Sequence, residues 1–113
     1  MRHLARHGDI WEGGGSPERM AELGAELDRA CAEVGRDPRE IAHGIVASDP
    51  GFRSLASEDA FRRHVAAYAA VGVTWFWFNM PRGAPSPTLI RISDRVIPEL
   101  REQALAGPAQ RPA

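Results

Sequence analysis

Hydrophobic positions along this chain form short apolar runs separated by longer segments in which apolar residues recur every three or four positions. The clearest run is residues 73–78, where five large apolar side chains are interrupted only by Thr74. This run is too short for an ordinary helix and rich in aromatic and β-branched residues, so it predicts a strand. Both faces of the strand are apolar, which is typical of a central parallel strand covered on two sides.

Two further strands are predicted at residues 8–11 and 41–47. Glycine-rich residues 12–15 follow the first as a flexible turn, and Ser-Asp-Pro-Gly at residues 48–51 is a turn signal after the second. In the second strand the odd-numbered positions form one face, and the even-numbered positions form the other. The odd face comprises Ile41, His43, Ile45 and Ala47.

The first full helix begins at Ser16, which is a good N-cap, and Pro17 suits the first helical position. Gly35 fits the position just past the helix end, and Pro38 prevents continuation. Between these signals the apolar residues form one stripe. The stripe comprises Met20, Leu23, Leu27, Ala30, Cys31 and Val34.

A second helix is capped by Ser57 and ends at Gly72. Its apolar stripe is formed by Phe61, Val65 and Tyr68. Two pairs of opposite charge at a spacing of four residues are predicted on its outer side. These pairs are Glu58 with Arg62 and Asp59 with Arg63.

The ends of the chain carry weaker signals. Residues 1–7 resemble the last part of a helix, and residues 81–88 contain three prolines and predict an irregular loop. A last helix is predicted over residues 93–104, with Val96, Ile97 and Leu100 facing inward and Pro98 kinking it. Residues 107–113 are polar and contain proline, and we expect a disordered tail.

The predicted order therefore alternates helix and strand, ending on a helix. Two full helices fill the gaps between successive strands, which is the arrangement of a parallel sheet in the α/β class. A length of 113 residues fits one domain with a single modest core, and no internal boundary is evident.

Composition narrows the function classes. The formal net charge is −1, all 14 basic residues are arginine, and no basic block interleaved with aromatic residues appears, so nucleic-acid binding is not predicted. No apolar run approaches the roughly 20 residues needed to span a bilayer. The N-terminus lacks the pattern of a secretory signal. A single cysteine, Cys31, cannot form an internal disulfide, which favours a cytoplasmic location.

Several stretches, taken together, resemble the luciferase-like monooxygenase family, which includes bacterial luciferase-like enzymes. The most specific are Ala-Arg-His-Gly-Asp-x-Trp at residues 5–11 and Val-Gly-Arg-Asp-Pro at residues 34–38. The stretches that carry the resemblance are residues 4–11, 16–18, 34–41, 68–78 and 96–101.

The resemblance implies a (β/α)8 barrel, known as a TIM barrel, and an oxidoreductase that uses reduced flavin mononucleotide (FMN) or the deazaflavin coenzyme F420. It covers only the C-terminal third of such a barrel, so residues 1–106 would supply its last three strands. The first five strands, and a glycine-rich loop that helps to hold the cofactor phosphate, would be absent. Residues 13–15 lead into a helix N-terminus, but a triple glycine is more often a flexible loop.

Candidate binding residues lie at the C-terminal ends of the predicted strands, where (β/α)-barrel enzymes place their sites. The resemblance implies that Trp11 borders a cofactor or substrate pocket, although it could instead fill the barrel top. Asn79 could offer its amide to a ligand, or it could stabilise the turn after its strand. No residue is assigned a catalytic role.

Other reactive side chains are given structural roles. His43 is expected to be a buried, hydrogen-bonded residue, with general-base catalysis as the alternative. Cys31 lies on a buried stripe and is expected to be a packed thiol. His3 and His7 have the spacing of a metal-binding pair, but no further ligands are evident and no metal site is predicted.

Two functional hypotheses follow. The first is the C-terminal portion of a flavin- or deazaflavin-dependent oxidoreductase, catalytically incomplete and without bound cofactor on its own. It would act on a small-molecule substrate once a complementary barrel segment is present. The alternative is a small non-catalytic α/β protein that self-associates to cover its sheet, because three strands cannot close a barrel and would leave open edges.

Overall fold

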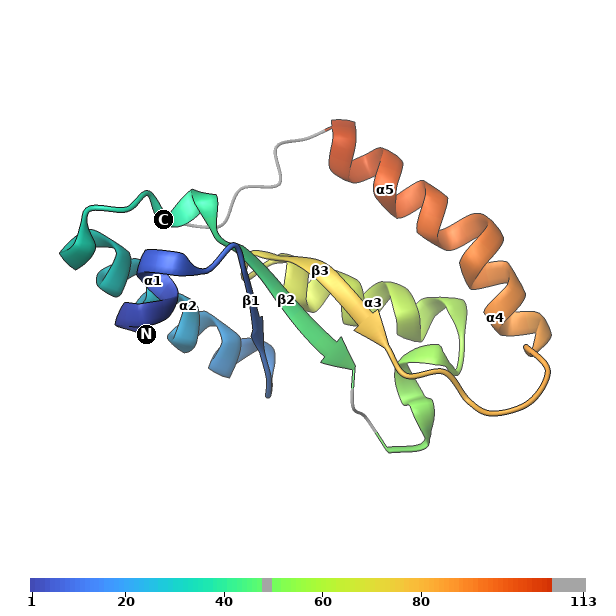
Figure 1. Cartoon of the computed structure of the whole chain (residues 1–113). Coiled ribbons are helices and arrows are strands. Elements are labelled where there is room, and N and C mark those ends of the chain that lie inside the picture. Colours follow the sequence, from blue (N-terminus) through green and yellow to red (C-terminus); the bar gives the residue numbers. More distant parts are fainter. Residues whose placement is uncertain (48–49, 107–113) are drawn as a thin grey trace.

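The computed structural model describes residues 1–47 and 50–106 of the chain. Ser48 and Asp49 of the predicted turn, and the predicted tail 107–113, lie outside the described residues. Helices and strands follow one another in the predicted alternating order (Figure 1). The main elements are α1 (Arg2–His7), β1 (Ile10–Gly13), α2 (Pro17–Val34), β2 (Ala42–Ala47), α3 (Glu58–Ala69), β3 (Val73–Phe78), α4 (Pro87–Arg91) and α5 (Ile97–Ala106).

The three strands form one parallel sheet in the order β1–β2–β3. The predicted α/β class, with three parallel strands alternating with helices, is therefore confirmed. The prediction that residues 73–78 form a central strand is wrong, because β2 is central and β3 lies at an edge. The apolar residues on both faces of β3 reflect one face that packs on helices and another that stays open.

One face of the sheet carries the helices (Figure 1). Near β1, residues from α1 and α2 join Ile41 in a buried cluster. In the middle, Met20 of α2 packs with Ile45 and Val73. Toward the C-terminal end of β3, Phe61 of α3 packs with residues of the last helical segment. The core therefore lies between the sheet and the helices near β1 and β2, and between α3 and the last helical segment beyond them.

The ends of α2 form as the sequence predicts. The Ser16 hydroxyl accepts a hydrogen bond from the Arg19 backbone N–H at 3.1 Å, and Gly35 adopts the left-handed conformation with φ of 73°. Ser57 caps α3 in the same way, accepting from the Ala60 N–H at 3.0 Å. Local capping chemistry therefore fixes the start of each long helix.

One of the two charge pairs predicted along α3, Glu58 with Arg62, is replaced by longer-range contacts. Arg62 forms an ion pair with Glu99 of α5 at 2.6 Å, and Glu58 forms one with Arg91 of α4 at 3.6 Å. Both partners lie in the helical segment that crosses α3. The predicted pairing fails because a helix packed alongside offers partners that the spacing along α3 does not reveal.

β1 begins and ends later than predicted. Residues 12 and 13, expected in a turn, continue the strand, and Gly13 pairs with Ile45 of β2. A side chain at Gly13 would have its Cβ 2.4 Å from the Met20 sulfur, so the missing side chain lets α2 approach the strand. Gly13 is a packing residue of the sheet and not a flexible link.

The C-terminal helical segment begins earlier than predicted. Ser86 caps it by accepting from the Leu89 N–H at 3.1 Å, and Pro87 occupies its first helical position. A π-helical turn at Ile92–Val96 joins α4 to α5. There the Ile97 N–H bonds to the Ile92 carbonyl, five residues back, just before Pro98. The predicted distortion at Pro98 thus takes the form of a widened turn.

Candidate functional site

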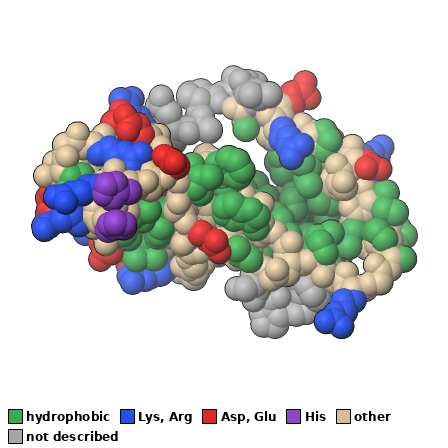
Figure 2. Space-filling view, in the orientation of Figure 1, with side chains coloured by type: hydrophobic (Ala, Val, Ile, Leu, Met, Phe, Trp, Pro, Cys, Tyr) green, Lys and Arg blue, Asp and Glu red, His purple; other side chains and the backbone are tan. Residues whose placement is uncertain are grey.

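The face of the sheet opposite the helices is the most unusual surface of the described residues. Strand alternation places Trp11, His43 and Ile45 toward the helices, so their neighbours along each strand point the other way. Figure 2 shows hydrophobic side chains gathered over the sheet in the middle of the view. The residues on this open face are Ile10, Glu12, Ala42, Gly44, Val46, Trp75 and Trp77.

Two tryptophans of β3 dominate the open face. The rings of Trp75 and Trp77 stack, with their centroids 6.1 Å apart and their planes inclined by 23°. Their exposed fractions are 48% and 38%, which is high for such large apolar side chains. Gly44 of β2 lies beneath them, and a Cβ there would be 2.3 Å from the Trp77 ring. The missing side chain at Gly44 is what allows this ring to lie over β2.

Glu12 is the charged residue on this face. It pairs with Gly44 across the β1–β2 ladder, and Gly44 pairs with Trp75 across the next. The carboxylate of β1 and the tryptophan of β3 therefore stand in one row, on either side of a residue without a side chain. Indole N–H groups donate hydrogen bonds and carboxylates accept them. The face thus presents an acceptor on one edge strand and donors on the other.

Trp11, predicted to border a pocket, lies on the helix-covered face. Its ring meets the buried His43 ring edge-on, with the centroids 5.0 Å apart. It also packs against the clusters that contain Leu27 and Met20 of α2. Trp11 therefore packs between the sheet and α2. A role in lining a pocket stays a prediction.

Asn79, the second predicted binding residue, follows the end of β3 and is exposed. Trp11 and Asn79 belong to the two opposite edge strands, and the structure does not bring them together. An interaction between Asn79 and a ligand stays a prediction. Met80, the next residue, is 59% exposed and extends the apolar surface beyond β3.

His43 is 2% exposed and lies between β2 and α2. A Cβ added at Gly24 of α2 would lie 3.2 Å from its ring, so the helix approaches closely at this point. The expected burial is confirmed. The ring is enclosed by Trp11 and α2, away from the open face, and this placement favours a structural role over catalysis.

The glycine turn does not form a cradle for a cofactor phosphate. The Gly15 carbonyl accepts a hydrogen bond from the Tyr68 hydroxyl at 2.6 Å, which fixes the turn against α3. At the start of α2, Ser16 already caps the Arg19 N–H, Pro17 has no N–H, and Glu18 adds negative charge. These residues do not fit an FMN or F420 phosphate, which needs free backbone donors and no carboxylate.

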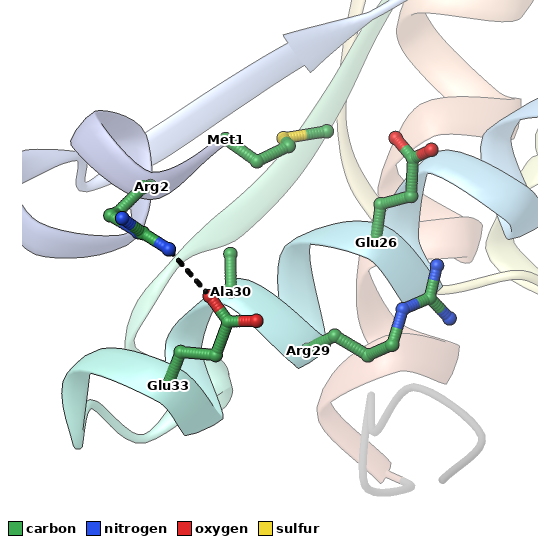
Figure 3. A pocket seen from close by; sticks show the side chains of 6 residues that line it. All are labelled: Met1, Arg2, Glu26, Arg29, Ala30 and Glu33. Atoms are coloured by element: carbon green, nitrogen blue, oxygen red, sulfur yellow. Dashed lines mark hydrogen bonds and ion pairs between the residues drawn. The ribbon is translucent and has the colours of Figure 1, made fainter.

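A surface hollow of about 410 Å³ lies between α1 and α2 (Figure 3). Charged side chains of both signs line much of it, and Arg2 pairs with Glu33 across it at 3.3 Å. Both partners of that pair are more than half exposed, so the hollow has the open, charged character of ordinary surface. It lies away from the open face of the sheet.

The remaining titratable groups form no reactive constellation in the described part of the chain. Within residues 1–47 and 50–106, no group of three or more His, Cys, Asp or Glu side chains is placed to hold a metal ion. Cys31 is fully buried, as expected. A hydrogen bond to Asp37, with the attraction between the two charges, raises the pKa of Arg39 above its ordinary value. Arg39 therefore stays charged and does not act as a base.

Arg36 links the two stretches that carry the family resemblance. Its guanidinium donates to the Ala5 carbonyl at 3.2 Å and to the Glu40 carboxylate at 3.1 Å, and it lies 3.8 Å from the Asp9 carboxylate. Ala5 and Asp9 belong to the first stretch, and Arg36 belongs to the second. Their contact lies before β1 and β2 begin, at the N-terminal ends of the strands. The motif residues joined here hold the fold together at that end.

Sequence reasoning missed Glu12 and Gly44 as parts of one surface. Glu12 was expected in a turn, so its alternation with Trp11 was not applied. Gly44 was expected on a strand face. The ring that lies over it belongs to Trp77 of β3, and the sequence near Gly44 does not show how β2 and β3 pair. The available signal was the presence of a large residue, Trp77, in one predicted strand and of a residue without a side chain, Gly44, in another, because large and small residues pack together across neighbouring strands.

Comparisons with protein-family models, with curated proteins and with solved structures found no match to this chain. The resemblance to luciferase-like monooxygenases therefore stays a prediction. Among the described residues, no helix combines the length and the apolar character needed to cross a membrane.

Proposed function

We propose that this chain is the C-terminal portion of a luciferase-like oxidoreductase or monooxygenase dependent on FMN or coenzyme F420, and that it is catalytically incomplete by itself. The observation that carries the proposal is the one-sided sheet, whose parallel strands have helices on one face and an apolar open face. In a closed (β/α)8 barrel, helices form the outer ring and the opposite face of the sheet lines the interior. Three strands supply part of such a wall and cannot close it.

The proposal assigns a pairing partner to each edge of the sheet. Additional strand–helix units would pair along β1 and β3, and Trp75 and Trp77 would become interior side chains. A small-molecule substrate would then bind at the C-terminal ends of the strands, where Asn79 lies. The cofactor phosphate would be held by the complementary segment, because the glycine turn before α2 does not fit it. With its single cysteine, Cys31, the protein would reside in the cytoplasm.

Flavin binding tests the proposal directly. We expect that FMN or F420, titrated into the purified chain, shows no saturable change in flavin fluorescence and no co-elution in gel filtration. A known flavin-binding protein serves as the positive control. Stoichiometric binding by this chain alone, at micromolar concentration, would overturn the claim that it is incomplete.

A gene-level observation tests the other half of the proposal. We expect an in-frame coding extension upstream of Met1, or a separate gene, that encodes five strand–helix units and a glycine-rich loop. Co-expression of that segment should restore flavin binding. If the joined segments form a folded complex without flavin binding, the assignment to this oxidoreductase class is wrong.

A second candidate function is a small non-catalytic α/β protein that self-associates to cover its sheet. The observation that favours it is the exposure of the tryptophan pair, because soluble monomers rarely leave large contiguous apolar patches open. The two candidates differ in what covers the open face. An enzyme segment covers it with further strands, and a self-associating protein covers it with another copy.

A further inference from the structure

We propose that two copies of this chain pack open face to open face about a two-fold axis parallel to β2, with each Glu12 opposite Trp75 of the other copy. The proposal rests on the second candidate function and specifies its interface. It starts from the row formed by Glu12, Gly44 and Trp75 across the three strands.

Symmetry determines which residues meet. A two-fold axis that lies between the sheets and runs along β2 exchanges the edges, so β1 of one copy lies over β3 of the other. Because Glu12 and Trp75 stand in the same row on opposite sides of Gly44, this rotation brings them together twice. The Trp77 rings, which lie over Gly44, then meet near the axis. The contact is self-complementary, as an interface between identical copies requires.

The competing arrangement is electrostatically unfavourable. A two-fold axis at right angles to the strands, along the same row, would place Glu12 opposite Glu12 of the second copy. Two carboxylates facing each other in an apolar interface repel, and neither gains a donor. Opposite Trp75, each carboxylate faces an indole N–H, which needs an acceptor when it is buried. Among the described residues of the open face Glu12 is the charged one, and its position favours the first arrangement.

The size of the face limits the affinity that we expect. Three strands at their usual spacing and rise span about 14 Å by 20 Å, which is roughly 280 Å² before the relief of the side chains is counted. A standard interface removes roughly 800 Å² from each partner. We therefore expect a weak dimer, of micromolar affinity.

Sedimentation equilibrium of the full chain between 1 and 200 µM tests the proposal. We expect a monomer–dimer equilibrium whose dissociation constant lies inside that range. Glu12→Ala removes the acceptor, and Trp75→Phe removes the donor but keeps an aromatic ring. Each substitution should raise the dissociation constant about tenfold, since each affects two symmetric contacts. Both residues are exposed in the monomer, so the variants should keep the helical circular dichroism signal of the wild type, and Trp75→Phe should lose only the exciton signal of the stacked tryptophans.

The double variant distinguishes this interface from any other. If Glu12 and Trp75 contact each other, the two effects are not additive, and the double variant is weakened at least about fivefold less than the product of the single effects. Glu102→Ala, a matched change on an exposed residue of α5, should leave the dissociation constant unchanged.

Three results would overturn the proposal. The first is a monomer throughout the concentration range, which leaves the barrel-segment proposal standing, because flavin titration tests that proposal separately. The second is a dimer in which the two substitutions act additively or have no effect, which means that copies meet elsewhere. The third is saturable binding of FMN by the monomer, competing with dimer formation, which would assign the face to a planar ligand.

Discussion

Replacing Arg36 by alanine should destabilise the protein more than any comparable substitution of an exposed arginine. The Arg36 side chain is 18% exposed and donates to the Ala5 carbonyl, which belongs to the last turn of α1. Carbonyls in that turn have no partner within the helix, so Arg36 caps α1 from outside with a positive charge. Removal leaves the carbonyl of a fully buried residue without this donor.

The expected magnitude combines one strong and two weak contacts. A hydrogen bond from a charged donor to a part-buried carbonyl contributes about 1.5–2 kcal/mol. The pairs with Glu40 and Asp9 add about 0.5 kcal/mol each, because both carboxylates are largely exposed. Arg36→Ala should therefore lower the free energy of unfolding by about 2.5–3 kcal/mol. With a urea dependence of about 1.5 kcal/mol per molar, the midpoint falls by about 2 M.

Urea unfolding followed by far-ultraviolet circular dichroism measures this change at a fixed protein concentration. Arg39→Ala is the matched control, because Arg39 is 78% exposed and pairs only with a neighbour in the turn, Asp37. It should change the free energy by less than about 0.5 kcal/mol. In 1 M salt the contributions of Glu40 and Asp9 should be screened, while the bond to Ala5 persists. A loss for Arg36→Ala no larger than that of the control would refute the reasoning.

Three further predictions concern single contacts. Tyr68→Phe should lower the free energy of unfolding by about 0.5–1.5 kcal/mol, because the hydroxyl bond to the Gly15 carbonyl is lost; an unchanged urea midpoint would contradict this. Gly44→Ala should displace the Trp77 ring and weaken the exciton signal of the stacked tryptophans in circular dichroism, and an unaltered signal would show that no displacement occurs. Cys31 should react with a thiol reagent at least about a hundredfold more slowly in folded than in urea-unfolded protein, and rapid labelling would mean that α2 opens readily.

Local signals in the sequence predicted the long helices and the alternation of helices and strands along the chain. Ser16 and Ser57 act as caps where the chain indicates, because capping depends on a few neighbouring residues. The same pair of signals, serine followed by proline, occurs at Ser86 and Pro87, where a helix also begins. It was overlooked because three prolines in residues 81–88 favoured a loop. The capping signal was therefore present in the sequence, but the proline-rich composition of residues 81–88 led to the prediction of a loop.

Features that depend on neighbours distant in the chain could not be predicted in the same way. The ion pair between Arg62 and Glu99 requires that the last helical segment cross α3, and no periodicity within α3 contains that fact. The edge position of β3 also depends on residues distant in the chain. An apolar run with two apolar faces indicates burial on both sides only when enough chain is present to cover both. Here the described helices all lie on the other face of the sheet, so Trp75 and Trp77 stay exposed.

The candidate site was the least predictable part, and the location of the motif residues explains why. Asp9 and Arg36, from the two most specific stretches of the family resemblance, meet at the N-terminal ends of β1 and β2. In (β/α) proteins that end contributes stability, and chemistry belongs to the opposite end of the strands. Between the two ends, the open face presents an acceptor at Glu12 and donors at Trp75 and Trp77. The contact between Asp9 and Arg36 therefore supports a stabilising role for the motif residues, whereas the function depends on what binds the open face.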